Sequence, residues 1–181
     1  AVSQQFPNLG LHCSFGEDNV IKLPFHTDVT NVILYHHENA NGTGPFHKKW
    51  DEIPLFARII HLCDLLDVMC RATSFTTDTW QRANDLLLKI NGSIADEECV
   101  HAFIQAFPEK HFLTLGDDDL DARLWAKVPR IKQDLNFTQI KSLADFFAQI
   151  VDYKSPFTCT HSIGVAEHAR KLSLFMGLEQ K

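Results

Sequence analysis

The chain has 181 residues, 45% of them hydrophobic and 22% charged, which is the composition of an ordinary soluble globular protein. Its formal net charge of -6 at pH 7 and the lack of a basic stripe argue against a protein that binds nucleic-acid polymers. No apolar run approaches membrane-spanning length and no signal peptide opens the sequence, so we expect a cytoplasmic protein without a membrane partner.

The cysteines and the histidines indicate different chemistry. The five cysteines are odd in number and lack Cys-x-x-Cys spacing, so we expect reduced residues that pack in the interior. Ten histidines are many for a chain of this length, and they are the feature of the composition that suggests metal binding.

The first part of the chain is expected to contain two helices. Its first 25 residues are weakly patterned and support at most a short helix around His12. Thr27 or Asp28 can cap a second helix, which ends near Asn39. A turn is expected at residues 41–45, because two glycines permit positive φ there and a proline stops the helix.

Two adjacent histidines, His36 and His37, come at the end of this second helix. Successive helical residues point about 100° apart, so the pair suits two neighbouring metal ions, or one ion and one substrate group. The alternative is a helix C-terminus that carries histidines because the helix dipole favours them there.

Pro54 begins a third helix, which is expected to run to about Ala72 and is apolar on nearly every face. A helix that is apolar all round is a buried one. Asp64 lies in the middle of this helix, and a buried carboxylate is costly unless it is paired or bound to metal. Its own helix offers only His61, three residues earlier, so Asp64 is the strongest ligand candidate among the acids.

Five further helices are expected, and none of the segments shows the sustained alternation of a strand. They span residues 76–91, 95–107, 117–127, 137–153 and a last segment from Thr158 or Thr160 to Met176. Lys154, Ser155 and Pro156 separate the last two, and a junction is expected at 129–136. The predicted fold class is therefore all-α, a helical bundle.

The residues between 33 and 69 resemble the HD-GYP family of bacterial cyclic-dinucleotide phosphodiesterases. The family pattern is His-His-Glu, two residues, Asp-Gly-x-Gly-Tyr-Pro, then Ile-Pro, then Ala-Arg-Ile before an Asp ligand. The chain reproduces its order and nearly all of its spacing with the residues His36-His37-Glu38, Gly42-Thr43-Gly44, Ile53-Pro54, Ala57-Arg58-Ile59, Asp64 and Asp67. The resemblance implies a helical bundle of the HD/HD-GYP type and a metal-dependent hydrolase of signalling nucleotides.

The resemblance also implies roles for individual residues. His36, His37 and Asp64 fall on metal-ligand positions, and His12 with Gly16 matches an earlier His-x-x-x-Gly ligand motif. Imidazole with carboxylate suits iron or manganese, in a dinuclear or trinuclear centre as in the family. Glu38 is open to three interpretations: a ligand, a residue that orients a ligand, or a surface residue.

The same resemblance places three further residues, Gly42, Gly44 and Arg58, at positions expected to contact a cyclic dinucleotide. A possible homodimer is the other partner that it suggests.

A second stretch, at residues 150–178, resembles the opening of another HD-GYP domain. Lys-Ser-Pro-Phe-Thr, His-Ser and a closing Gly-Leu recur in such openings, and His161 falls on a position that binds metal in some members. We therefore expect residues 1–135 to be the C-terminal part of one HD-GYP-like domain and residues 136–181 to be the first helices of a second.

Three departures from the family pattern indicate that the first domain is degenerate. The chain has no adjacent His-Asp pair, and Gly-Tyr-Pro is replaced by Gly44-Pro45-Phe46. The Arg-Pro-Tyr-Arg segment is replaced by Thr73-Ser74-Phe75-Thr76, which cannot supply the two phosphate-binding arginines. Three ligands without the dyad predict a weak metal site that can be empty.

Two functions remain open at this point. The first is a phosphodiesterase that hydrolyses cyclic di-GMP or a mixed cyclic GMP-AMP, in which residues 1–135 alone are inactive. The second is a non-catalytic regulatory or dimerising domain of the HD-GYP type. Fold alone does not decide between them, because function depends on the site.

Overall fold

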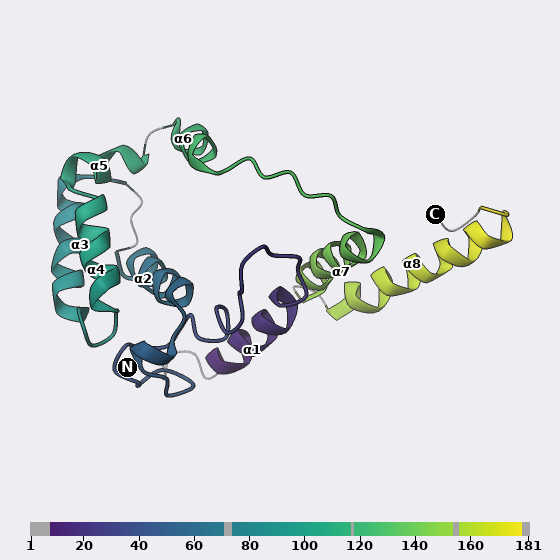
Figure 1. The fold of residues 1–181 in the computed structure, drawn as a ribbon, viewed down its shortest axis with the longest axis horizontal. Helices are drawn as coiled ribbons and strands as arrows, with labels where there is room; N and C mark the ends of the chain where they lie inside the picture. The colour runs from purple at the N-terminus through teal and green to yellow at the C-terminus, as the bar shows by residue number, and fades with distance from the viewer. Residues whose placement is uncertain (1–7, 71–73, 117, 154–155, 179–181) are drawn as a thin grey trace. The chain divides into compact units, whose positions relative to one another are not determined.

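The computed structural model describes residues 8–70, 74–116, 118–153 and 156–178, and the regular secondary structure of these residues is helical (Figure 1). The helices are α1 (Leu9–Val20), α2 (Leu55–Cys70), α3 (Thr77–Ile90), α4 (Glu97–Ala106), α5 (Glu109–Leu113), α6 (Leu120–Lys127), α7 (Phe137–Tyr153) and α8 (Pro156–Phe175), with 3-10 turns η2 (Trp50–Glu52) and η3 (Thr114–Gly116). Two isolated β-bridges form but no strand occurs among the described residues. The all-α prediction is confirmed.

The chain divides into two compact units. The first contains the residues up to Ile21 together with Thr27–Lys132, and the second contains Lys22–His26 together with the chain from Gln133 onward. The first unit therefore holds α1 to α6, and the second holds α7 and α8. That the second unit opens another HD-GYP domain stays a prediction.

The core of the first unit lies between α2, α3 and α4. Leu87 of α3 is fully buried and packs with side chains from both neighbouring helices. The other buried members of this cluster are Leu62, Leu65, Ile90, Ala95, Cys99 and Val100. The i, i+3 and i, i+4 spacing of these residues places them on the inward faces of their helices.

Local capping sets where α3 and α4 begin. The Thr76 hydroxyl accepts a hydrogen bond from the Thr79 amide, and the Asp96 carboxylate accepts one from the Cys99 amide. Thr76 is also the first residue of the range 76–91 in which this helix was expected. The short helix α5 was not expected, since Pro108 was interpreted only as the end of the preceding helix. Proline also suits the start of a helix, and Pro108 is the N-cap of α5.

The helix expected from Thr27 or Asp28 to Asn39 does not form. This segment is a succession of turns, and Asn31 has a positive φ of 63°. The amides of Asn31, Ile33 and Leu34 donate to the carboxylate of Glu17. Three amides that would form the hydrogen bonds of a helix thus donate to the Glu17 side chain of α1 instead. The local sequence of residues 27–39 does not reveal this contact.

Helix α2 forms as predicted but is not buried all round. Leu55, Phe56 and Val68 are each about half exposed, at 51%, 51% and 52%. The Asp64 side chain is itself 41% exposed, so the argument that it is a costly buried charge was wrong. A helix on the outside of a small bundle buries only the face that meets its neighbours.

In the second unit, α7 packs against α8 and has the predicted bounds. Helix α8 starts at Pro156, earlier than the predicted Thr158 or Thr160, because proline suits the first turn of a helix. The predicted break at Lys154 and Ser155 lies outside the described residues. At its other end the helix closes at Gly177, whose φ is 73°.

None of the helices in the described parts of the chain combines the length and apolarity needed to span a bilayer.

Candidate metal centre

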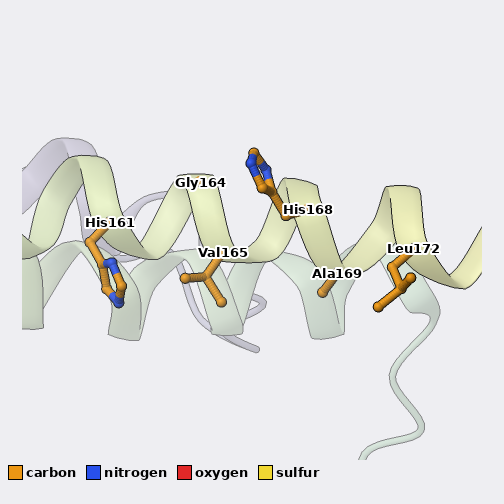
Figure 2. Close-up of a pocket in the computed structure, with 6 residues that line it drawn as sticks. All are labelled: His161, Gly164, Val165, His168, Ala169 and Leu172. Atoms are coloured by element: carbon orange, nitrogen blue, oxygen red, sulfur yellow. The ribbon is translucent and has the colours of Figure 1, made fainter.

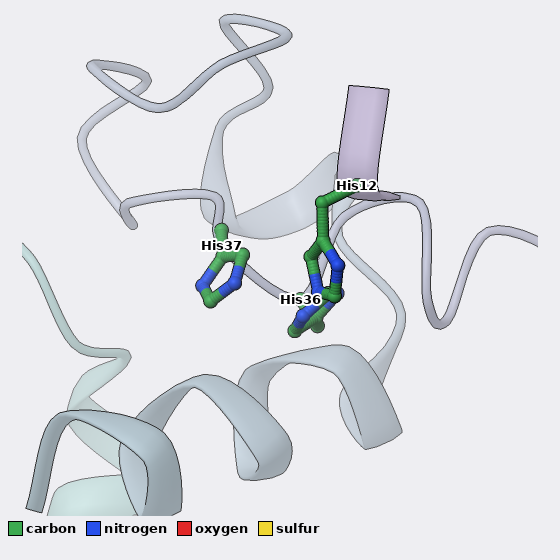
Figure 3. A group of neighbouring side chains, drawn as sticks. All are labelled: His12, His36 and His37. Carbon is green, nitrogen blue, oxygen red and sulfur yellow. The ribbon is translucent and has the colours of Figure 1, made fainter. Parts of the chain in front are cut away.

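Three histidines from two separate segments converge in the first unit (Figure 3). His12 lies on α1, and His36 and His37 lie on the turns that follow it. One nitrogen from each ring lies within 4.8 Å of the other two. The rings of His36 and His37 have centroids 4.0 Å apart, so they face one cluster instead of diverging as on a helix.

His36 is held in one orientation by its own backbone segment. Its Nδ1 lies 2.5 Å from the carbonyl oxygen of Ile33, and this contact requires the proton on Nδ1. The lone pair is then on Nε2 and is available to a metal ion. Burial lowers the pKa of His36, more than the hydrogen bond to Ile33 raises it.

His37 contacts the predicted acidic ligand. Its Nδ1 lies 3.6 Å from Oδ2 of Asp64, across 27 residues of sequence. This is longer than a hydrogen bond but within the separation of two donors that share one ion, because each lies about 2.1 Å from the metal. Burial, reinforced by His36, lowers the pKa of His37 to about 4, so the ring is neutral at pH 7.

His61 of α2 supports the cluster from a neighbouring element. Its Nδ1 lies 3.1 Å from the carbonyl oxygen of His36, and the side chain is buried. Its Nε2 is also buried and has no hydrogen-bond partner among the described residues. In the sequence His61 was noticed only as a neighbour of Asp64; its contact with His36 is a product of the tertiary fold.

Glu38 shapes the turn that follows the histidines. It is only 2% exposed, and its two carboxylate oxygens accept hydrogen bonds of 2.6 Å from the amides of Phe46 and Lys48. The surface interpretation of Glu38 is therefore wrong. Both of its oxygens serve the backbone, so Glu38 organises the loop instead of offering a free oxygen to a metal.

The two glycines of this loop have structural reasons to be there. Gly42 has a φ of +80°, which side chains rarely tolerate. A Cβ on Gly44 would lie 2.7 Å from the Cα of Glu38 and 2.8 Å from its carboxylate, so only glycine fits. The expectation that both glycines contact substrate stays a prediction.

Arg58 is occupied elsewhere in the first unit. Its Nη1 donates to the Asp96 carboxylate at 3.1 Å and lies 4.0 Å from Glu98. The pair joins α2 to the start of α4. A substrate role for Arg58 stays a prediction and requires that this ion pair open or that another guanidinium nitrogen reach the ligand.

The first unit does not contain the fifth predicted ligand, because His161 belongs to the second. It lines an open pocket on α8 with His168, Val165 and Leu172, and Figure 2 shows His161 and His168 on different sides of the helix. No group of metal-binding side chains includes His161 among the residues described. Its assignment as a ligand stays a prediction.

The donor set of the first unit fits a divalent transition metal. Imidazole nitrogens and one carboxylate are the ligands of iron and manganese sites, and rings with lowered pKa values bind metal without first losing a proton. When bound, such an ion supplies Lewis-acid polarisation of a phosphodiester oxygen. His12, His36, His37 and Asp64 are the residues that would hold and orient the ion.

Comparisons with known proteins found a matching family model, similar sequences and a similar solved structure. The family model described as HD domain matches residues 8–98, which contain all the clustered residues. The chain is 27% identical to 3'3'-cGAMP-specific phosphodiesterase 1 of Vibrio cholerae over 97% of its length, and 30% identical to 3'3'-cGAMP-specific phosphodiesterase 3 of that organism over 90%. A crystal structure of a cyclic GMP-AMP specific phosphodiesterase from V. cholerae, 28% identical, covers 91% of the chain with a TM-score of 0.72.

The chain is shorter than these relatives. It spans 43% and 36% of the two curated proteins and 40% of the chain in the crystal structure.

Proposed function

Because the chain belongs to the HD domain family, we propose that it serves a metal-dependent phosphodiesterase that acts on a cyclic dinucleotide. The substrate would be cyclic di-GMP or a mixed cyclic GMP-AMP, and the domain within residues 1–135 would be degenerate. The observation that carries the proposal is the convergence of His12, His36 and His37, with Asp64 3.6 Å from His37.

The metal would be held by the three imidazoles and the Asp64 carboxylate. Iron or manganese suits these donors, and a structural zinc site rich in thiolates does not. Cys13, which follows His12 in the sequence, is buried and is not a member of the three-histidine group, and burial raises the pKa of its thiol to about 11. The ligands are therefore nitrogen and oxygen atoms.

Weak or absent hydrolysis by this domain follows from what its site lacks. No adjacent His-Asp pair occurs in the sequence, and threonine, serine and phenylalanine replace the expected arginine segment at 73–76, where Thr73 lies outside the described residues. Arg58, the one arginine of α2, forms an ion pair with Asp96. Stabilisation of the charged phosphoryl transition state is usually the largest catalytic term, and its cationic groups are missing.

The second part of the proposal concerns residues 136–181. We infer that α7 and α8 are the first helices of a second HD-GYP domain, with His161 as one of its ligands. The support is the motif at 150–178 and the exposure of Ile140, Phe147 and Ile150 on α7. Two helices alone bury too little apolar surface to form a stable domain, so these side chains need further helices to cover them. An adjacent His-Asp pair encoded downstream of Lys181 is expected, and a stop codon or an unrelated domain there would contradict it.

The alternative is a regulatory or dimerising module without chemistry of its own. Two observations favour it for residues 1–135. Arg58 forms an ion pair with Asp96, and Gly42 and Gly44 are required by the conformation and packing of the loop. Under this alternative the domain would act by packing and not by turnover.

The test uses the purified 181-residue chain with Mn²⁺ or Fe²⁺. We expect titration calorimetry to detect metal binding that His37→Ala removes, while His101→Ala, at an exposed position on α4, leaves binding unchanged. Incubation with 3'3'-cGAMP or cyclic di-GMP should give little or no linear product. Absence of metal binding would contradict the metal site. Robust turnover that disappears in His37→Ala would contradict the degenerate first domain.

A further inference from the structure

We propose that Glu17 is the positioning residue that brings His12 together with His36 and His37. It lies on α1, five residues after His12, and its carboxylate reaches the segment that leads into the other two histidines. The consequence for metal affinity rests on the proposed metal-binding function, whereas the structural role of Glu17 does not.

The contacts of Glu17 are unusually many for one side chain. Its Oε1 accepts from the Asn31 amide at 2.5 Å, and its Oε2 accepts from the amides of Ile33 and Leu34 at 3.1 and 3.0 Å. The residue is only 8% exposed. Hydrogen bonds to an ionised acceptor are roughly twice as strong as neutral ones, so these three contacts fix the backbone immediately before His36.

The need for such an acceptor follows from the local backbone. Residues 30–37 form turns and Asn31 is in the left-handed region, so the amides of Asn31, Ile33 and Leu34 have no backbone carbonyl partner among the described residues. Buried amides without partners are costly. One carboxylate with two oxygens satisfies three of them, and it does so from the helix that carries His12.

A second observation shows how closely α1 lies against this segment. A Cβ added to Gly16 would be 2.6 Å from Cγ2 of Ile33, a distance that real Cβ atoms do not show. Gly16 thus permits the approach and Glu17, the next residue, bonds to the same stretch. The carbonyl oxygen of Ile33 also accepts a hydrogen bond from Nδ1 of His36. The contacts therefore run without a gap from α1 to the imidazole ring of His36.

Glu17 is not itself a metal ligand in this arrangement. Both of its oxygens are engaged by backbone amides, and it is not a member of the three-histidine group. It acts through the geometry of the histidines, which makes it a positioning residue.

The test compares Glu17→Gln with two controls. Glutamine offers one acceptor oxygen and places an amide group against backbone donors, so we expect Co²⁺ affinity to fall about 10- to 100-fold and the ligand-field spectrum to change. Asp18→Asn, at an exposed neighbouring position, should leave both unchanged. Val100→Ala, in the core of α2 to α4, should lower stability but leave Co²⁺ affinity unchanged below its unfolding transition.

A second readout uses metal-free protein. In Glu17→Gln the amide proton shifts of Asn31, Ile33 and Leu34 should move upfield. The ring contact between His12 and His36, whose centroids lie 5.4 Å apart, should weaken. If Glu17→Gln does not fold, Glu17→Asp, which keeps the charge one methylene shorter, takes its place in both measurements.

The outcomes separate the two proposals. If the unaltered chain binds no Co²⁺, the metal function fails, and the amide shifts and ring contact of the metal-free variant alone decide the role of Glu17. Unchanged shifts overturn the positioning proposal. When Co²⁺ does bind, unchanged affinity in Glu17→Gln, or an equal loss in Val100→Ala, also overturns it.

Discussion

The histidine-bearing segment, residues 27–49, and the packed helices α2 to α4 are held by different kinds of interaction. The segment has little regular structure, and its backbone amides donate to two buried carboxylates, Glu17 and Glu38. The helices satisfy their own amides and associate through apolar side chains such as Leu62, Leu87 and Val100. A few strong directional contacts support the site, and many weak contacts support the core.

This difference predicts different consequences of substitution. Removing a core side chain lowers the free energy of unfolding but leaves the folded site as it was, because no single apolar contact sets its geometry. Removing a carboxylate from the segment leaves several amides without a partner and releases the backbone that carries the histidines. The predictions below test this division, from the largest expected effect to the smallest.

The largest effect is expected for Leu87→Ala, because Leu87 is fully buried in the centre of the α2 to α4 core. The cavity should cost about 2–5 kcal/mol of unfolding free energy, measured by urea denaturation. Leu88→Ala, at a neighbouring site that is 70% exposed, is the matched control and should change stability little. If Leu87→Ala instead altered metal binding by the folded protein, the division between core and site would be incorrect.

Glu38→Gln should come next, at about 2–3 kcal/mol, because both part-buried amides lose an ionised acceptor and one of them then faces the NH2 group of glutamine. Unlike the core variant, it should also weaken metal binding. Asp51→Asn, at an exposed acid near the same loop, is the control for loss of charge. Equal metal affinity in Glu38→Gln and the unaltered chain would show that the loop does not support the histidines.

Gly44→Ala separates packing from substrate contact. The new Cβ would overlap Glu38, so we expect a loss of about 1–3 kcal/mol. Gly164→Ala, within α8 and with nothing within 4 Å, should instead stabilise its helix by about 0.5–1 kcal/mol. Thermal unfolding of both variants is the measurement. An unchanged melting temperature for Gly44→Ala would leave substrate contact as the better explanation of this glycine.

A smaller, pH-dependent effect is expected at Asp96. Burial raises its pKa, but the hydrogen bond from the Cys99 amide and the Arg58 guanidinium together bring it below the usual 3.8. The ionised form therefore stabilises the fold above pH 3.8, and this contribution is lost as the pH falls through the lowered value. Asp96→Asn should cost about 1–2 kcal/mol at pH 7.

The control for this pH dependence is Asp78→Asn, in an exposed pair with Arg82 at the start of α3. Urea unfolding at pH 7 and at successively lower pH should show the difference between Asp96→Asn and the unaltered chain shrinking below pH 3.8. A difference that stays constant down to acid pH would show that packing, and not charge, explains Asp96.

The smallest effect is expected for Lys141→Ala. Its pair with Asp145 lies on the exposed face of α7, four residues apart, and such pairs contribute about 0.3–0.5 kcal/mol or less. The loss should diminish in high salt. A loss above about 1 kcal/mol would show that this face of α7 is more ordered than an exposed helix surface.

Where local signals agreed with the fold, the sequence predicted elements closely. Helix α7 has the expected bounds because its apolar residues repeat with helical spacing and Asn136 and Gln139 cap each other's amides at its start. The position of α2 after Pro54 followed for the same reason. The convergence of His37 with Asp64 was expected from the motif, while their assignment as metal ligands remains a prediction.

The tertiary structure decided those features that depend on contacts between residues distant in the sequence. Residues 27–39 have the cap and the apolar spacing of a helix, yet Glu17 takes the amides of Asn31, Ile33 and Leu34 and holds turns in its place. The contact of His61 with His36 likewise joins residues 25 positions apart. Sequence periodicity reports bonds between near neighbours in the chain, whereas the geometry of this site depends on side chains that reach a distant backbone.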